Sequence, residues 1–211
     1  MRIYDGKYLS VTSVLELRKP FNKESFKNWC LKEGLNEALV SSTSRVLGEK
    51  VSEYLNNISV GLRGITAPPV DMLEGRLYSA VDKFLEKWEL VSTEQVVYCD
   101  ELHYAGRYDG IIREKGTRNI LLVDWKTYGA WNGKPYKRVS NKLKSAKEQL
   151  TMYAYAMNWE KEMGVVIFKN DGTWEIEKVV FEKGILEWVK AHQKEIIKLI
   201  KQENEKVSKK V

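Results

Sequence analysis

The chain has 211 residues, 43% of them hydrophobic, and this length suffices for one sizeable core. Lys and Arg number 35 against 29 Asp and Glu, so the formal net charge of +6 suits a polyanionic partner without requiring one. The two cysteines exclude a disulfide framework and are too few for an iron–sulfur cluster. We find neither a signal peptide nor an apolar run that could span a bilayer, and therefore expect a cytoplasmic protein.

The N-terminal part, residues 1–92, is predicted to be mainly helical. Apolar residues recur with helical spacing over residues 24–39, 42–56 and 72–90. The glycines and adjacent prolines of residues 61–70 separate the last two of these segments.

Residues 93–181 are predicted to form the sheet core, because the pattern changes to period two after Thr93. A helix is expected within this core at residues 143–160, and Asn-Asp-Gly at 170–172 is typical of a hairpin turn. The first three strands would form a β-meander and the last two a hairpin. The predicted strands cover residues 95–98, 104–113, 119–126, 163–169 and 173–181.

The C-terminal residues 182–207 are predicted to form one long helix. No internal repeat, low-complexity block or linker divides the sequence. We therefore expect one domain over residues 1–211, of the α/β class, with a mixed central β-sheet flanked by α-helices.

Asp124 and Lys126 lie two residues apart at the end of the apolar run of residues 120–123, which is typical of a central strand. Strand alternation places both side chains on one face and Trp125 on the other. A carboxylate there can hold Mg²⁺ or Mn²⁺ together with the backbone carbonyl of Trp125, and the ammonium can stabilise charge on a phosphodiester. The alternative is a solvent-exposed ion pair, which is common on strands.

A second carboxylate, Asp109, lies fifteen residues upstream on the preceding predicted strand. Neighbouring antiparallel strands can bring Asp109 and Asp124 to one metal ion. Gly106 and Gly110, on either side of Asp109, favour a close approach of backbone or substrate. In the alternative interpretation, Asp109 is a turn residue without a catalytic role.

Three segments together resemble the motifs of the PD-(D/E)XK nucleases. They are GRYDGII at residues 106–112, LLVDWKT at 121–127 and QLTMYAYAM at 149–157. Their order is similar to that of the RecB-like branch, with Gly-X-X-Asp, Asp-X-Lys and Gln-X-X-X-Tyr. Upstream, residues 8–16 and 47–55 resemble the opening segment and first-motif helix of that branch. The resemblance implies a restriction-endonuclease-like core and a metal-dependent nuclease activity.

The resemblance also implies a role for each matching residue. Asp109 and Asp124 would bind the metal ion, and Lys126 would be the catalytic lysine. Gln149 and Tyr153, four residues apart on one helical face, would lie beside the active site. An ordinary core aromatic residue is the alternative for Tyr153.

Glu53 falls in the first-motif helix, where the RecB-like branch often carries a histidine before the acid. Here Ser52 precedes Glu53. We predict that Glu53 takes part in metal binding or catalysis, and the alternative is a solvated helix carboxylate. The missing histidine leaves open whether one or two metal ions bind and how strong the activity is.

A basic, aromatic segment at residues 128–141 lacks any helical or strand period and is predicted to be an exposed loop. Its Lys134, Lys137 and Arg138 are candidates for binding nucleic-acid phosphates, and the alternative is a generic flexible loop. Arg107, close to the first aspartate, is a further candidate, and the alternative for it is an outward-facing strand arginine.

These features predict a Mg²⁺- or Mn²⁺-dependent deoxyribonuclease without an iron–sulfur cluster, acting in DNA replication, recombination or repair. Exonuclease, structure-specific endonuclease and junction resolvase activities are all compatible with the sequence, and no residue excludes RNA as the substrate. A hypothesis from another class is a catalytically weak or inactive protein that binds nucleic acid or regulates it while keeping this fold.

No phosphate-binding loop of the Gly-X4-Gly-Lys-Ser/Thr type is present. We therefore expect the protein to act alone, as a homodimer, or with a separate helicase or recombination partner, and to have no membrane partner. Its size resembles that of stand-alone nucleases of archaeal viruses, including the spindle-shaped ones, and this resemblance implies the host cytoplasm.

Overall fold

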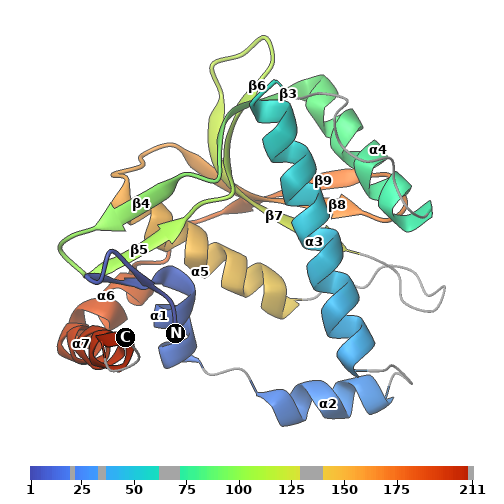
Figure 1. The fold of residues 1–211 in the computed structure, drawn as a ribbon. Coiled ribbons are helices and arrows are strands. Elements are labelled where there is room, and N and C mark those ends of the chain that lie inside the picture. Colours follow the sequence, from blue (N-terminus) through green and yellow to red (C-terminus); the bar gives the residue numbers. More distant parts are fainter. Residues whose placement is uncertain (20–21, 33–36, 62–71, 129–139, 209–211) are drawn as a thin grey trace.

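The computed structural model describes residues 1–19, 22–32, 37–61, 72–128 and 140–208. Its strands form two mixed sheets, and helices flank them (Figure 1). The predicted α/β class is therefore confirmed, but the single central sheet that we expected is two sheets. None of the described helices is long and apolar enough to cross a membrane.

The order of elements along the chain alternates between helical and strand-rich stretches. The helices are α1 (Val11–Arg18), α2 (Lys23–Lys32), α3 (Glu37–Ser59), α4 (Met72–Lys87), α5 (Ser140–Ala156), α6 (Lys183–Ala191) and α7 (Gln193–Ser208). The strands are β1 (Ile3–Tyr4), β2 (Tyr8–Ser10), β3 (Trp88–Thr93), β4 (Val96–Cys99), β5 (Tyr104–Arg107), β6 (Gly110–Glu114), β7 (Ile120–Tyr128), β8 (Glu162–Lys169) and β9 (Trp174–Val179).

The larger sheet has the strand order β3-β6-β7-β8-β9, and the smaller sheet has the order β1-β2-β5-β4. Strands β7 and β8 are parallel, and α5 is the crossover between them, as parallel neighbours require. In the smaller sheet β2 and β5 are parallel, and the other pairs in both sheets are antiparallel. The long strand β7 is thus central to the larger sheet.

The predicted strand over residues 104–113 is wrong, because the structure divides it into β5 and β6, which belong to different sheets. The chain passes from the smaller to the larger sheet at Tyr108 and Asp109. Burial continues to alternate through this crossing, since Tyr108 is buried between two exposed or half-buried neighbours. A period-two pattern therefore does not reveal the break.

Other elements also differ from the prediction. The helix expected over residues 72–90 ends at Lys87, because β3 begins with Trp88 and pairs with β6. The single C-terminal helix is two helices, α6 and α7, separated at His192, whose ring stacks on Trp188. Strands β1 and β2 have two and three residues, too short for a periodic signal, and were not predicted.

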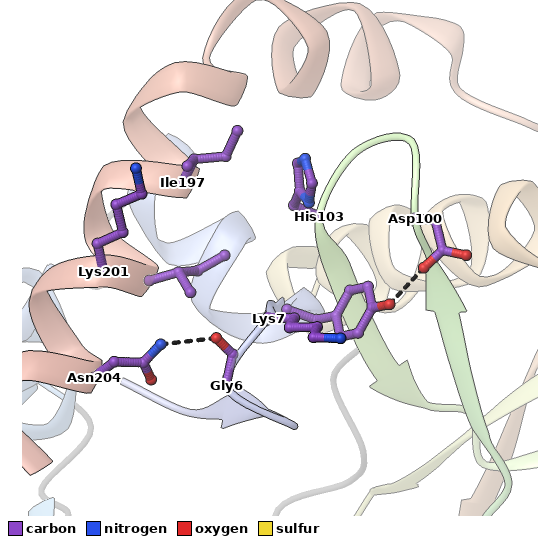
Figure 2. A pocket seen from close by; sticks show the side chains of 9 residues that line it. Gly6, Lys7, Asp100, His103, Ile197, Lys201 and Asn204 are labelled. Carbon is purple, nitrogen blue, oxygen red and sulfur yellow. Dashed lines mark hydrogen bonds between the residues drawn. The ribbon is translucent and has the colours of Figure 1, made fainter. Parts of the chain in front are cut away.

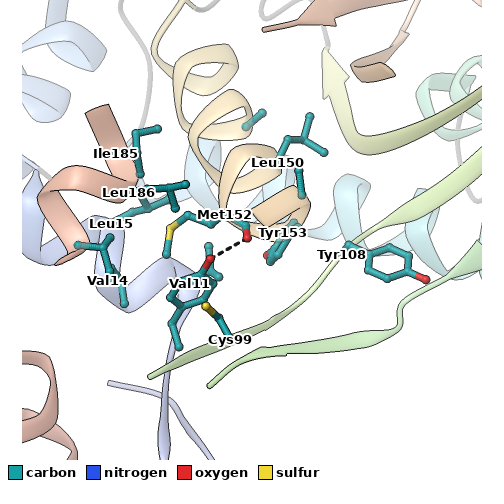
Figure 3. Close-up of a cluster of buried hydrophobic side chains, with 14 of the residues drawn as sticks. Val11, Val14, Leu15, Cys99, Tyr108, Leu150, Met152, Tyr153, Ile185 and Leu186 are labelled. Carbon is teal, nitrogen blue, oxygen red and sulfur yellow. Dashed lines mark hydrogen bonds between the residues drawn. The ribbon is translucent and has the colours of Figure 1, made fainter. Parts of the chain in front are cut away.

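The two faces of the larger sheet bury separate apolar clusters. On one face, Val123 and Trp125 of β7 pack with Phe84 of α4 and with buried residues of α3. On the other face, Leu122 of β7 packs with Leu150 of α5, in the cluster that Figure 3 shows in part. Side chains of β7 therefore alternate between the α3/α4 face and the α5 face.

The glycines on either side of Asp109 make room for two large aromatic rings. A Cβ atom added to Gly106 would lie 2.6 Å from Cε1 of Tyr153, on α5. A Cβ atom added to Gly110 would collide with the indole ring of Trp125. Both glycines have ordinary φ angles, so close packing and not backbone conformation requires them.

We predict that Gly110→Ala lowers the free energy of unfolding by about 1–3 kcal/mol, because the methyl group overpacks against Trp125. Urea denaturation followed by tryptophan fluorescence measures this change. Gly184→Ala is the matched control, since its Cβ atom would meet nothing within 4 Å and Gly184 lies in α6. That control should gain about 0.5–1 kcal/mol, and equal effects at the two sites would contradict the packing argument.

Candidate active site

Asp109 lies where β6 separates from β7. Gly110 is the first β6 residue to pair, opposite Val123, so the backbone N–H of Trp125 has no strand partner on that side. The carboxylate of Asp109 replaces it, because its Oδ2 atom accepts a hydrogen bond from Trp125 N at 2.8 Å. The side chain of Asp109 thus continues the sheet by one residue and is fixed against β7.

Asp124 points from β7 toward the α5 face, and only 1% of its surface is exposed. Its Oδ2 atom forms an ion pair with Nζ of Lys126, two residues along the same strand. In the described part of the chain this oxygen accepts no hydrogen bond of normal geometry. The pair is therefore not the solvent-exposed ion pair of the alternative interpretation, since burying a carboxylate this deeply is costly.

Lys126 reaches the surface while it contacts the buried carboxylate. Its side chain is 24% exposed. Burial lowers the pKa of Lys126, but the negative charges of Asp124 and Asp109 outweigh burial and hold that pKa above its usual range. Lys126 is therefore protonated, and its side chain is partly exposed to solvent beside two carboxylates.

The electrostatics of Asp109 show an excess of negative charge at this position. Burial and the charge of Asp124 together raise the pKa of Asp109 to about 7, although Lys126 and the Trp125 N–H lower it. Two carboxylates face one lysine, so the cluster lacks one positive charge. A divalent cation would restore the balance, and carboxylate oxygens are the ligands that Mg²⁺ prefers.

The main-chain carbonyl of Trp125 adds a third oxygen at the same edge. In a strand the N–H and C=O of one residue point to the same side, and the Trp125 N–H points to Asp109. The buried Asp124 oxygen, which accepts no hydrogen bond, and this all-oxygen set fit a hard divalent cation. Among the described residues no three His, Cys, Asp or Glu side chains gather as a metal cluster.

Helix α5 brings Tyr153 and Gln149 to the same region. Tyr153 is buried, and burial raises the pKa of its hydroxyl, with the charges of Asp109 and Asp124 raising it further. The hydroxyl therefore stays protonated. Gln149, one turn away, is half-buried, and its amide donates a long hydrogen bond of 3.5 Å to Ser145 Oγ. Tyr153 is thus both a core aromatic residue and a neighbour of the carboxylates.

The structure does not bring Glu53 to this cluster. Val51 and Leu55, on either side of Glu53, are buried on the α3/α4 face, whereas Glu53 is exposed. Its charge acts on Tyr78 of α4. No contact joins Glu53 to Asp109 in the described structure, so its catalytic role stays a prediction.

Glu94 is a carboxylate near the site that sequence analysis missed. Its backbone N–H donates to the carbonyl of Asp109 at 3.2 Å, and its charge contributes to the raised pKa of Asp109. Its Oε2 atom pairs with Nε of Arg107 at 2.6 Å. Glu94 follows a strand in a short connection, and no motif or period in the sequence distinguishes it from a surface residue.

The predicted nucleic-acid-binding residues fall into two groups. Lys134, Lys137 and Arg138 lie outside the described residues. Arg107 is described, and its side chain is 50% exposed. It is an outward-facing strand arginine, and it also lies two residues from Asp109.

A separate hollow of about 370 Å³ lies between α7, the β1–β2 turn and the β4–β5 turn (Figure 2). Hydrogen bonds from Asn204 to the Gly6 carbonyl and from Tyr8 to Asp100 join these segments. The hollow is at the start of β5, whereas Asp109 follows the end of that strand. It is therefore not part of the candidate active site.

No family model and no curated protein matches the chain. Among solved structures, the crystal structure of SSO0001 is 17% identical, covers 91% of this chain and 77% of that one, and has a TM-score of 0.39. An alkaline exonuclease from Laribacter hongkongensis is 13% identical, with 97% and 93% of the two chains covered and a TM-score of 0.45. Its complex with dAMP is 12% identical over the same shares, with a TM-score of 0.44.

All three TM-scores are below 0.5. The resemblance of the motifs to the RecB-like branch stays a prediction, as does a viral origin.

We predict that Lys126→Met lowers the free energy of unfolding of the metal-free protein by about 3 kcal/mol, because it leaves the buried Asp124 carboxylate without a counter-charge. Adding Asp124→Asn to that variant should restore most of the loss. Urea denaturation of the two single variants and the double variant measures the coupling. Additive effects would show that the two side chains do not stabilise each other.

Proposed function

We propose that the protein is a metal-dependent nuclease that hydrolyses phosphodiester bonds of DNA. The observation that carries this proposal is the buried Asp124 carboxylate, placed between Lys126 and the Asp109 crossing with an excess of negative charge. A group of acids that is costly in the metal-free protein is typical of a functional site. The net charge of +6 on the whole chain is compatible with DNA as the substrate.

Each residue has a distinct part in the proposed reaction. Asp109 and Asp124 would hold a Mg²⁺ or Mn²⁺ ion, with the Trp125 carbonyl as a third oxygen ligand. The ion supplies Lewis-acid stabilisation of the charge that develops on the phosphodiester. Lys126 donates to the same developing charge, and Asp124 keeps it protonated and aimed. Tyr153 remains a proton donor on the α5 side.

A second candidate is a nucleic-acid-binding protein of the same fold that does not cleave. Ser52 in place of a histidine, and the absence of a three-acid cluster among the described residues, favour this candidate. Cleavage and binding assays on the same substrates separate the two functions.

We predict that the protein cuts DNA only when Mg²⁺ or Mn²⁺ is present, and that Lys126→Ala and Asp124→Asn each lower the rate at least about 100-fold, since each removes a group that would act on the developing charge. Linear, single-stranded, flapped and four-way-junction DNA, together with an RNA strand, form the substrate panel. End-labelled products separate exonuclease from endonuclease activity.

Lys178→Ala is the matched control for this assay. Lys178 also pairs with a glutamate, Glu162, but that pair is exposed on β8 and β9 and the variant should cut at the parent rate. Cleavage of DNA by Asp124→Asn at the parent rate, or no cleavage of any substrate by the parent, would refute the proposed nuclease.

We predict that Mg²⁺ or Mn²⁺ at a hundredfold excess over its Kd raises the melting temperature of the parent by about 5–10 °C. The cation offsets the repulsion between Asp109 and Asp124, so Asp109→Asn and Asp124→Asn should lose the shift. Differential scanning fluorimetry measures it without any substrate. An equal shift in Asp124→Asn would place the bound ion elsewhere in the protein.

A further inference from the structure

Glu94 has an unfavourable backbone conformation for its residue type. Its φ angle is +55°, in the left-handed region that costs an L-residue conformational energy and that glycine occupies freely. Its side chain is only 24% exposed, and burial raises its pKa while Arg107 opposes that rise. A glutamate that bears both costs beside a candidate active site points to a function that glycine would not supply.

Glu94 is coupled directly to the chain crossing that holds Asp109. The backbone N–H of Glu94 donates to the Asp109 carbonyl at 3.2 Å, and Tyr108 N donates to the Gln95 carbonyl at 3.1 Å. These two bonds join the β3–β4 connection to the β5–β6 crossing. The backbone of Glu94 is therefore fixed relative to Asp109.

The ion pair with Glu94 uses one side of the Arg107 guanidinium. Glu94 Oε2 contacts the Nε atom at 2.6 Å, which leaves the two terminal nitrogens and their four N–H groups. In the described part of the chain no acceptor contacts those nitrogens, and half of the side chain is exposed. Terminal guanidinium N–H groups held in a fixed plane match two oxygens of a phosphate.

We propose that Glu94 and Arg107 form a phosphate clamp beside the active site. Arg107 binds a backbone phosphate of the nucleic acid next to the one that is cleaved, and Glu94 is a positioning residue that orients the guanidinium. Arg107 lies two residues from Asp109, about 7 Å along an extended chain, so the clamp acts on a phosphate near the carboxylates. This proposal rests on the proposed function, because it names how that site holds its substrate.

The clamp and simple electrostatics predict opposite effects of Glu94→Ala on DNA affinity. Removing the negative charge of Glu94 should tighten binding of a polyanion if Glu94 only contributes charge. If Glu94 orients Arg107, then Glu94→Ala should weaken DNA binding about fivefold despite that charge change, and Arg107→Ala should weaken it about tenfold. The slope of log Kd against log salt should fall by about one for Arg107→Ala.

Binding is measured by fluorescence anisotropy with a labelled DNA oligonucleotide and Ca²⁺ in place of Mg²⁺, with a gel to check that the strand stays intact. Glu94→Gln keeps the length of the side chain but not its charge and should bind between the parent and Glu94→Ala. The control is the pair Glu89 and Arg113, which joins β3 and β6 through the same Nε atom and whose arginine is as exposed as Arg107. Glu89→Ala and Arg113→Ala should change Kd less than twofold.

Stability gives the second readout. Glu94→Gly relieves the left-handed strain, so its melting temperature should rise by roughly 2–4 °C while its DNA affinity falls as in Glu94→Ala. In the cleavage assay Glu94→Ala should raise KM and leave kcat within about threefold, as expected when a ground-state phosphate contact is lost.

Each outcome decides one of the two proposals. If Glu94→Ala binds DNA as tightly as the parent or more tightly, the clamp is wrong whatever the cleavage assay shows. If the parent binds DNA and the variants follow the expected order but no metal supports cleavage, the clamp holds and the proposed hydrolysis fails. If the parent binds no nucleic acid, both fail.

Discussion

The hydrogen bond from Trp125 N to the Asp109 carboxylate is the contact on which the geometry of the site depends. It lies where the chain leaves the smaller sheet for the larger one, and it satisfies a main-chain donor that β6 no longer reaches. The need of the sheet for an acceptor at that point fixes the Asp109 carboxylate beside β7. Because Asp124 is the preceding residue of β7, the same contact fixes the distance between the two acids. A requirement of backbone pairing thus assembles the candidate metal site.

Packing on both faces of the sheet supports this arrangement. Trp125 fills the α3/α4 face and lies against Gly110, and Tyr153 fills the α5 face and lies against Gly106. The two glycines that bracket Asp109 therefore bring a large ring close to the crossing from each side. Dense packing leaves little room for the crossing to move. Packing of the core therefore holds the Asp109 carboxylate in place, although the residue lies between two strands.

Sequence periodicity predicted the parts of the site that depend on one strand or one helix. Asp124 and Lys126 share a face, Trp125 occupies the other, and Tyr153 projects from α5 toward the acids, as alternation and helical spacing require. Periodicity could not predict the parts of the site that depend on contacts between distant segments. The crossing at Asp109 keeps a strand-like pattern while it changes sheets, and Glu94 reaches the site through a bond between two loops. The site role of Glu53 was predicted from motif order and stays a prediction. The buried Val51 and Leu55 place its side chain on the exposed face of α3.

The charges of the region form two pairs with different environments. Asp124 is buried deep in the sheet, where losing Lys126 leaves its charge uncompensated, so this pair contributes to the stability of the fold. Arg107 is nearer to solvent, where an ion pair with Glu94 contributes little to stability. Its guanidinium can release bound water and bind an anion there. Asp109 lies between the two pairs. Burial and the charges of Asp124 and Glu94 contribute to raising its pKa to about 7. A cation at Asp109 and Asp124 would relieve the inner repulsion, and a phosphate at Arg107 would meet the outer positive charge. The inner pair is therefore suited to chemistry and the outer pair to binding, because catalysis needs charges in fixed positions and association needs an accessible one.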